Sequence, residues 1–327
     1  MSANSHHTAA ALALIADDMS SMDQIVDRRL TSTVPLVSQV SRYIIAAGGK
    51  RLRPALLLLM SGVLGYVGEQ RLKMAAVVEF IHTATLLHDD VVDESTLRRG
   101  RATANDVFGN PASVLVGDFL YSRAFQMMVE AGDMRIMQTL AEATNVIAEG
   151  EVLQLMNMHN ANLTEDDYLL VIRSKTAKLF EASARLAALL ARSSPGIEQH
   201  CAAYGQALGT AFQVIDDVLD YDGDAQIMGK NLGDDLREGK ATLPLIIAMQ
   251  RASSAERATI SLAIETSGLE NMAEIITIME KTGALEATRK VAASEAQRAL
   301  DSLENLPQNN YSQVLHQLAS QLLGRRA

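Results

Sequence analysis

Residues 70–93 read QRLKMAAVVEFIHTATLLHDDVVD, and this stretch does most to decide the fold. It contains no proline or glycine, and apolar residues such as Val77, Ile81 and Ala84 recur at helical spacing. The spacing predicts one long helix that ends in a group of aspartates.

The aspartate pattern at the end of this helix occurs twice in the chain. The first copy is Asp89-Asp90-Val91-Val92-Asp93, and the second copy, much further along, is Asp216-Asp217-Val218-Leu219-Asp220. Both read D-D-x-x-D, and both follow apolar helical sequence. Because positions i and i+4 share one face of a helix, the outer aspartates of each copy should point the same way.

Like charges one helical turn apart repel each other, so such a site favours a bound cation. Mg²⁺ takes one or two carboxylates together with the phosphate oxygens of a substrate, so two facing clusters would hold several ions around one diphosphate. The ordinary alternative is a solvated acidic face, but Val91, Val92, Val218 and Leu219 make both helices apolar around the carboxylates. An EF-hand is excluded, because its glycine and its ligand loop are missing.

The composition favours one large helical protein. The chain has 327 residues, of which 48% are hydrophobic, and only 6 prolines. Because we find no linker or change of composition, we expect a single all-α domain over residues 1–327, folded as one helical bundle. Residues 1–20 are expected to be a weakly ordered start. A net charge of −10 disfavours nucleic acid as a partner.

The chain shows no sign of export or of a membrane span. Its N-terminus lacks the basic start and apolar run of a signal peptide, and the longest apolar run, near Ala55–Met60, is too short to cross a bilayer. The single cysteine, Cys201, excludes a disulfide within the chain. We therefore expect a cytoplasmic protein with at most peripheral membrane contact.

Local signals predict where several helices begin and end. Thr164 followed by three acidic residues is typical of a helix start. Pro54 and Pro244 are expected to open helices. We expect interruptions at Pro111, Gly117 and Pro195-Gly196, and a loop or broken helix over residues 222–239.

Basic residues accompany both aspartate clusters. Arg98 and Arg99 follow the first cluster, and the stretch from Lys230 to Lys240 follows the second. Arginine binds phosphate oxygens through a fork and lysine as a point charge. Each residue alone is typical of a solvated surface. Together they give an acidic protein two basic sectors, which suits two anionic substrates, only one of them chelated by metal.

The motifs taken together resemble those of the trans-isoprenyl diphosphate synthases, most closely the bacterial ones that build eight-unit chains for quinones. The likeness extends from about residue 20 to the end and departs at no motif position. Besides the two aspartate clusters, it rests on GGKRLRP (48–54), EFIHTATLLH (79–88), GDFLY (117–121), SKTA (174–177) and FQ (212–213).

The resemblance implies a helical bundle around a central cavity, the type I isoprenoid synthase fold. It also implies a homodimeric prenyltransferase that uses Mg²⁺ to join isopentenyl diphosphate to an allylic diphosphate. It implies metal-binding roles for both aspartate clusters, which are Asp89, Asp90, Asp93, Asp216, Asp217 and Asp220. It implies contacts to the allylic diphosphate from Arg98, Lys175, Thr176, Gln213, Lys230 and Lys240. It implies contacts to isopentenyl diphosphate from Lys50, Arg53, Arg99 and His82, although a lone helical histidine is as often a core residue. The residues expected to carry the reaction are Asp89, Asp90, Asp93, Lys175, Asp216, Asp217 and Lys230.

The length of the product should depend on residues below the first cluster. Ala84 and Thr85, one turn before Asp89, are small, so an elongating tail could pass them towards Ile81 and Met127. We predict a long product. The resemblance implies eight isoprene units, with a nine-unit or a shorter product as the alternative. The alternative is that the small residues serve only close packing between helices.

Two other functions stay open on the residues alone. A terpene cyclase also ionises a diphosphate on an aspartate-rich helix, but it would normally lack the second D-D-x-x-D and the Gly-Gly-Lys-Arg region. A non-catalytic synthase subunit would be expected to have lost one cluster, whereas both are present. The spacing also disfavours a short-chain bacterial synthase, because only two residues separate Asp90 from Asp93.

Overall fold

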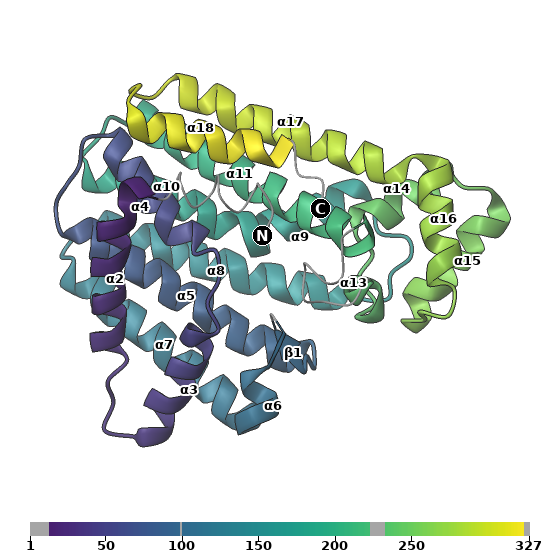
Figure 1. The fold of residues 1–327 in the computed structure, drawn as a ribbon, viewed down its shortest axis with the longest axis horizontal. Coiled ribbons are helices and arrows are strands. Elements are labelled where there is room, and N and C mark those ends of the chain that lie inside the picture. Colours follow the sequence, from purple (N-terminus) through teal and green to yellow (C-terminus); the bar gives the residue numbers. More distant parts are fainter. Residues whose placement is uncertain (1–12, 99, 223–232, 324–327) are drawn as a thin grey trace. The chain divides into compact units, whose positions relative to one another are not determined.

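A computed structural model describes residues 13–98, 100–222 and 233–323, and it is almost entirely helical (Figure 1). Arg99 and Lys230, both predicted site residues, lie outside the described residues. The chain groups into two compact units. The first unit comprises Met1–Thr144, Leu179–Gly205 and Asp301–Leu318, and the second comprises Asn145–Lys178, Gln206–Leu300 and Ala319–Ala327.

The elements follow one another as helices with one small hairpin. Up to the middle of the chain they are η1 (Ala13–Ile15), α2 (Ala16–Arg29), α3 (Pro35–Ala46), α4 (Leu52–Val63), α5 (Gln70–Val92), β1 (Leu97–Arg98), β2 (Arg101–Ala102), α6 (Ala104–Phe108), α7 (Asn110–Glu130) and α8 (Met134–Met156). The remainder are α9 (Glu165–Ile172), η2 (Arg173–Ala177), α10 (Lys178–Leu190), α11 (Pro195–Asp222), α13 (Asp234–Arg237), α14 (Leu243–Arg251), α15 (Ser254–Thr266), α16 (Met272–Thr282), α17 (Ala284–Glu304) and α18 (Asn310–Leu323).

The all-α prediction is confirmed, and the helix predicted over residues 70–92 is α5. Thr164 caps α9 as expected, because its side chain accepts the backbone N–H of Asp167. One expected interruption is wrong, because Gly117 lies inside α7. Pro111 and Pro195 each lie in the first turn of a helix, so the breaks expected there fall just before α7 and α11. Residues 13–20, for which we expected little order, form η1 and the start of α2.

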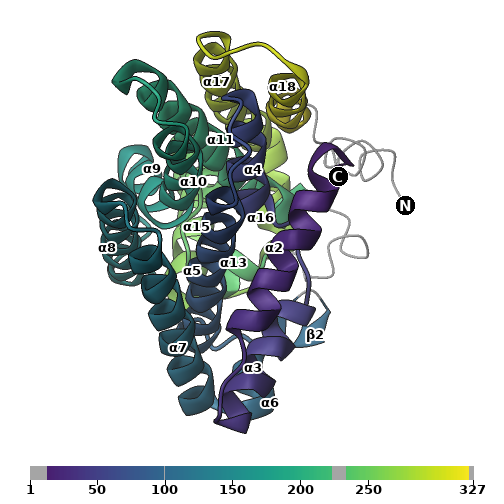
Figure 2. The same ribbon diagram turned by 90° about the vertical axis from the view of Figure 1, so that its left-hand side faces the viewer.

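The first unit is built around α5. This helix packs along α7 and also contacts α2 and α4, and the views in Figures 1 and 2 agree that α5 and α7 run side by side. Close approach depends on small residues of α7. The Ser113 hydroxyl donates to the Leu87 carbonyl, and a Cβ on Gly117 would lie 2.2 Å from Nε2 of His88. The first aspartate cluster is therefore fixed where α5 meets the start of α7.

The second unit has its own apolar core. The core joins α9, α11, α14, α15 and α16 through fully buried residues such as Leu243, Leu245, Ile264 and Ile275. Figure 1 shows α14, α15 and α16 gathered together. The N-terminal end of α15 is fixed by a reciprocal capping box between Ser253 and Glu256. This core supports the segment of α11 that carries the second aspartate cluster.

A π-helical turn, η2, joins α9 to α10. Such turns are rare and are often found at functional sites. Here the turn carries Lys175 and Thr176. Gly150 of α8 packs directly on it, because a Cβ there would lie 2.8 Å from Cβ of Ser174 and 2.9 Å from the backbone nitrogen of Lys175. Only glycine lets the two backbones approach this closely.

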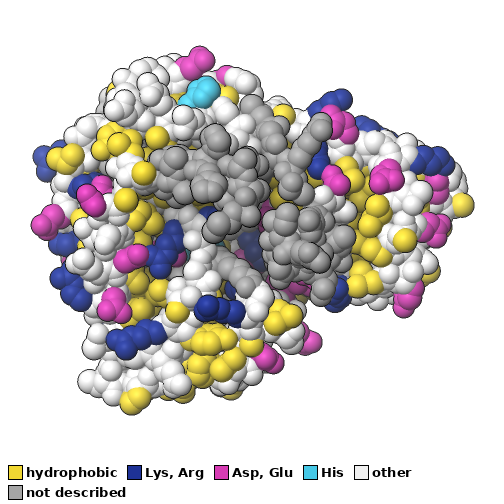
Figure 3. All heavy atoms as spheres, viewed as in Figure 1, with side chains coloured by type: hydrophobic (Ala, Val, Ile, Leu, Met, Phe, Trp, Pro, Cys, Tyr) yellow, Lys and Arg dark blue, Asp and Glu magenta, His cyan; other side chains and the backbone are white. Residues whose placement is uncertain are grey.

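Within the described residues, none of the helices is long and apolar enough to cross a membrane. On the face drawn in Figure 3, lysine and arginine side chains lie among acidic and hydrophobic ones and form no continuous basic field on the coloured surface.

Candidate functional site

The first aspartate cluster lies in the last turn of α5. The backbone N–H of Asp93 donates to the carbonyl of Asp89 at 2.8 Å, so these two residues lie one turn apart, as the spacing predicts. Asp89 and Asp93 are partly exposed, whereas Asp90 is fully buried. The cluster therefore presents two carboxylates towards solvent and holds the third inside.

The buried Asp90 has a cationic partner from the β1–β2 hairpin. Oδ1 of Asp90 accepts hydrogen bonds from Nε and NH2 of Arg98, at 2.9 and 2.7 Å. Oδ2 of Asp90 is buried and has no hydrogen-bond partner among the described residues. Arg98, expected to contact a diphosphate, thus also neutralises the first cluster from within.

A second basic residue, Arg53, lies at the start of α4. NH1 of Arg53 lies 3.2 Å from Nε2 of His82, and its guanidinium lies 4.6 Å from the ring centroid of Phe180. Burial lowers the pKa of Arg53 to about 10, against the opposing pull of the Glu79 and Asp89 carboxylates. The side chain stays charged at neutral pH, so it can bind a phosphate.

The loop before α4 has unusual backbone geometry. Gly48 has a φ of 71°, and Arg51 adopts a left-handed conformation with a φ of 45°. Lys50 is exposed, while Arg51 forms an ion pair with Asp23 and lies 3.8 Å from Glu79. The glycine permits the sharp turn that brings these cations to the N-terminus of a helix, where anions bind well.

The second cluster lies near the end of α11. Asp216 is exposed, whereas Asp217 and Asp220 are buried. The carboxylate of Asp220 accepts the backbone N–H groups of Asp234 and Asp235, at 3.2 and 3.1 Å. Asp220, expected as a metal ligand, thus also anchors the short helix α13.

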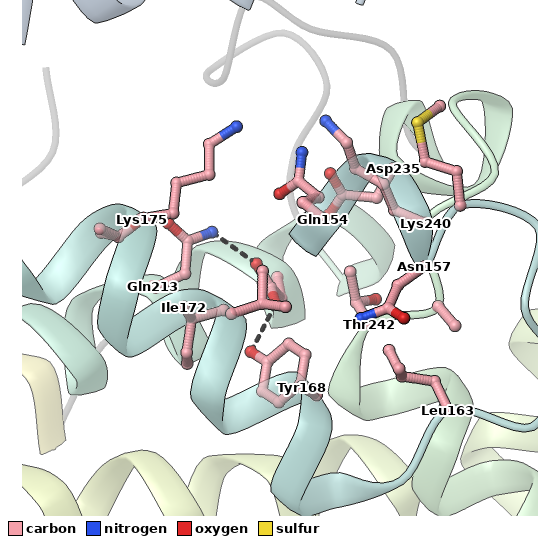
Figure 4. Close-up of a pocket in the computed structure, with 15 residues that line it drawn as sticks. Gln154, Asn157, Leu163, Tyr168, Ile172, Lys175, Gln213, Asp235, Lys240 and Thr242 are labelled. Carbon is pink, nitrogen blue, oxygen red and sulfur yellow. Dashed lines mark hydrogen bonds between the residues drawn. The ribbon is translucent and has the colours of Figure 1, made fainter. Parts of the chain in front are cut away.

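Asp217 is held by two neutral donors, Tyr168 and Gln213, which are both labelled in Figure 4. Its Oδ2 accepts the hydroxyl of Tyr168 at 2.6 Å, and its Oδ1 accepts Nε2 of Gln213 at 2.7 Å. The amide oxygen of Gln213 in turn accepts the hydroxyl of Thr176 at 3.0 Å. Both ends of the Gln213 amide are therefore occupied by protein groups.

Neither of these hydrogen-bond donors is a cation, and the pKa of Asp217 reflects this. Burial raises the pKa of Asp217 well above its ordinary value, and the nearby carboxylates of Asp235 and Asp216 raise it further, against the hydrogen bonds from Tyr168 and Gln213. Burial, followed by the charge of Asp217, also raises the pKa of the Tyr168 hydroxyl, which keeps it a donor. A divalent cation would relieve this repulsion.

The second unit contains a pocket of about 140 Å³ beside Asp217. In Figure 4, Lys175, Gln154, Asp235 and Lys240 lie on one side of it, and Tyr168 and Leu163 on the other. The ammonium group of Lys175 lies 2.6 Å from Glu151. Five predicted site residues line this pocket: Lys175, Thr176, Gln213, Asp217 and Lys240.

The donors present suit Mg²⁺. Among the described residues, no three His, Cys, Asp or Glu side chains already form a cage for a metal ion. Mg²⁺ is usually held by one or two carboxylates, waters and substrate phosphates, so a cage is not required. The buried free oxygen of Asp90 and the repelling carboxylates around Asp217 are the groups that a cation would satisfy.

The residues predicted to control product length lie within the first unit. Ala84, Ile81 and Met127 are buried, on α5 and α7. Thr85 is partly exposed, and its hydroxyl donates to the carbonyl of His82 at 2.7 Å. Ala84 and Thr85 thus lie one turn before Asp89 on the same helix, as expected.

Two residues of the second site were not predicted from the sequence. Asp235 lines the pocket and raises the pKa of Asp217, and Tyr168 binds Asp217 directly. Asp235 lies in a run that we noted only for its lysines. For Tyr168 the sequence carries no local signal, because the hydrogen bond joins positions 49 residues apart.

Known proteins resemble this chain over nearly its whole length. An octaprenyl diphosphate synthase of Escherichia coli (strain K12) is 49% identical over 94% of this chain and 95% of its own length. An all-trans-nonaprenyl-diphosphate synthase (geranyl-diphosphate specific) of Rhodobacter capsulatus is 46% identical over 96% of this chain and 97% of its own. The crystal structure of a polyprenyl synthase from Caulobacter crescentus, complexed with calcium and isoprenyl diphosphate, aligns with a TM-score of 0.93 and 42% identity, over 98% of both chains.

The family model for polyprenyl synthetases matches residues 34–282, a range that holds both aspartate clusters and every basic residue discussed above. With two D-D-x-x-D clusters on an all-helical scaffold, the chain therefore belongs to the polyprenyl synthetase family.

Proposed function

We propose that the chain condenses isopentenyl diphosphate with an allylic diphosphate, such as farnesyl diphosphate, into an all-trans octaprenyl diphosphate for the side chain of ubiquinone or menaquinone. The observation that carries this proposal is the pair of aspartate clusters, each with a buried central carboxylate and basic residues nearby. The names of the Escherichia coli and Rhodobacter relatives support a long product of eight or nine units.

Magnesium is the proposed cofactor, with Asp89, Asp90 and Asp93 of one cluster and Asp216, Asp217 and Asp220 of the other as the residues that would hold it. When bound, Mg²⁺ would stabilise the negative charge that grows on the departing diphosphate. The Caulobacter polyprenyl synthase is complexed with calcium and isoprenyl diphosphate, which supports a divalent cation as the cofactor.

The basic residues bind and orient the two substrates. The allylic diphosphate is bound by Arg98, Thr176, Gln213, Lys175, Lys230 and Lys240. The lysines also stabilise the negative charge that develops as the C–O bond breaks. Lys50, Arg53, His82 and Arg99 bind isopentenyl diphosphate, so that its double bond attacks the allylic carbocation. A proton is then lost to the released diphosphate. No side-chain nucleophile takes part.

A carbocation reacts with water, so the site must exclude it. We infer that the segment from Lys230 to Lys240 orders over the bound substrates. Its described end supports this, because Gly239 has a φ of 75° and its carbonyl accepts the N–H of His159 at 2.8 Å. This contact fixes the position from which Lys240 extends into the pocket.

The decisive test uses the purified chain alone with labelled isopentenyl diphosphate, farnesyl diphosphate and Mg²⁺. An octaprenyl product identified by mass is expected. Turnover of the allylic diphosphate without isopentenyl diphosphate would identify a terpene cyclase. Inactivity of the pure chain, restored by a second protein, would identify a non-catalytic subunit.

Product length is proposed to depend on the space beside Ala84. Because Ala84 is fully buried on α5, a bulky ring there would obstruct the path of the tail. The variant Ala84→Phe should release products several units shorter at a similar rate of first condensation. The matched variant Leu262→Phe, at an exposed position of α15, should leave the product unchanged. An unchanged product from Ala84→Phe would contradict the proposed path.

We further propose a homodimer that works in the cytoplasm with at most peripheral membrane contact. Support for the homodimer comes from the exposed apolar residues of α7, namely Val114, Leu115, Phe125 and Val129. Self-association would cover such a stripe. Light scattering should give twice the chain mass, and Leu115→Glu combined with Val129→Glu should give a monomer.

A further inference from the structure

Tyr168 and Asp217 share a short hydrogen bond in the second unit. The phenol oxygen lies 2.6 Å from Oδ2 of Asp217, within the range of about 2.5–2.7 Å for a hydroxyl that donates to a carboxylate. Both residues are buried, at 4% and 3% exposure. The contact is therefore well shielded from competing water.

The other oxygen of Asp217 is also fixed from inside the protein. Gln213 donates to Oδ1, and Thr176 holds Gln213 in that orientation. Each oxygen of a carboxylate has two lone pairs, so one hydrogen bond on each leaves the other pair available for a cation. The network fixes the orientation of the Asp217 carboxylate and leaves one lone pair on each oxygen for a cation.

The π-turn makes this arrangement possible. In a regular α-helix, Thr176 would lie about 80° around the axis from Tyr168, eight residues earlier. A turn with i→i+5 hydrogen bonds takes up about one more residue, so eight residues make about two whole turns. Tyr168 and Thr176 therefore share one face, and both line the pocket that contains Asp217.

We propose that Tyr168 is a positioning residue for the prenyl transfer, acting through Asp217, which it holds in the orientation that binds Mg²⁺. The proposal rests on the metal-binding role proposed above for Asp217. Outer hydrogen bonds of this kind orient ligands and typically change metal affinity about 10–100-fold when removed. Tyr168 itself does not touch the reacting atoms.

The test measures binding of Mn²⁺ alone, without diphosphate, by the loss of the free-ion signal in electron paramagnetic resonance. Tyr168→Phe should weaken the site that involves Asp217 by about 10-fold or more. In assays, the Mg²⁺ concentration for half-maximal rate should rise, while kcat at saturating Mg²⁺ should recover most of its original value. If Tyr168 served only to stabilise the fold, its loss would not raise the half-saturating Mg²⁺ concentration while leaving kcat at saturating Mg²⁺ nearly unchanged.

Tyr204→Phe is the matched control. Tyr204 is buried in the first unit, and its hydroxyl donates to the carbonyl of Leu315 at 2.7 Å. The variant loses one buried hydroxyl, as Tyr168→Phe does, and should keep the original Mn²⁺ affinity. If Tyr168→Phe does not fold, Gln213→Met removes the bond to the other oxygen of Asp217 and should weaken Mn²⁺ in the same way.

Asp217→Asn separates the two proposals. If this variant keeps full Mn²⁺ affinity, the metal-binding role of Asp217 is wrong, and the inference about Tyr168 fails with it. If Asp217→Asn loses the site but Tyr168→Phe, or Gln213→Met in its place, binds Mn²⁺ within twofold of the original protein, the inference alone is overturned.

Discussion

The two aspartate clusters have the same sequence pattern but opposite internal environments. The central carboxylate of the first, Asp90, is buried against the guanidinium of Arg98. The central carboxylate of the second, Asp217, is buried against the neutral side chains of Tyr168 and Gln213. Among the described residues, the first cluster has its own counter-charge, whereas the hydrogen-bond partners of Asp217 are neutral donors that orient it.

This difference has an energetic consequence. A buried ion pair repays the cost of desolvation only when both partners are present. A buried carboxylate without a cation instead takes up a proton more readily, as the raised pKa of Asp217 indicates. The first cluster should therefore be stable without metal, whereas the second should depend on metal for its charged state.

The largest expected effect is on activity, and both clusters should share it. Asp90→Asn and Asp217→Asn should each lower kcat about 10³-fold, because a metal ion contributes several kcal/mol of charge stabilisation. Steady-state assays with labelled isopentenyl diphosphate measure it. The control Asp166→Asn, an exposed acid on α9, should keep its rate. A normal rate in either cluster variant would remove that cluster from the mechanism.

Breaking the ion pair should destabilise the first cluster alone. Arg98→Met leaves Asp90 buried without its cation and should lower the free energy of unfolding by about 3 kcal/mol. Arg101→Met is the control, because Arg101 lies opposite Arg98 in the β-strand register and its side chain is exposed. The loss of the Arg101 side chain should cost less than about 0.5 kcal/mol. Urea unfolding measures both. Equal values would show that the pair with Asp90 adds nothing.

The second cluster should be sensitive to the packing behind its π-turn instead. Gly150→Ala places a Cβ 2.9 Å from the backbone nitrogen of Lys175, so the turn must shift, at a cost of about 1–3 kcal/mol. The half-saturating Mg²⁺ concentration should rise as well. Gly196→Ala, with no atom within 4 Å of the new Cβ, should be neutral or slightly stabilising. If the two variants behave alike, the packing of α8 does not hold the turn.

The sequence was a good guide wherever structure depends on local periodicity. The bounds of α5, the shared face of Asp89 and Asp93, and the cap at Thr164 follow from spacing and short-range hydrogen bonds. Such features need only neighbours within one or two turns, which a sequence displays directly.

The differences between the clusters could not be predicted, because they depend on partners from other segments. Arg98 reaches Asp90 from strand β1, which pairs with β2, and strands of two residues leave no periodic signal. Tyr168 reaches Asp217 across 49 positions. The π-turn has no composition of its own, since it depends on Gly150 of another helix for space. The expected break at Gly117 was wrong for the same reason, because that glycine serves helix packing.

The smallest expected effect is a pH dependence that separates the two clusters. An Asp217 carboxyl in the unfolded chain ionises near its ordinary pKa of 3.8, but in the metal-free native protein its pKa is raised. Between these two pKa values the native state binds more protons than the unfolded state, so the free energy of unfolding falls as pH rises. The variant Asp217→Asn has no carboxyl to titrate at this position, so it lacks this fall in the free energy of unfolding. Its Tm, measured in a metal chelator, should therefore rise relative to that of the original protein as pH increases, and added Mg²⁺ should reverse the difference. Parallel Tm curves across pH 5–9 would mean that Asp217 is as well neutralised in the metal-free protein as Asp90.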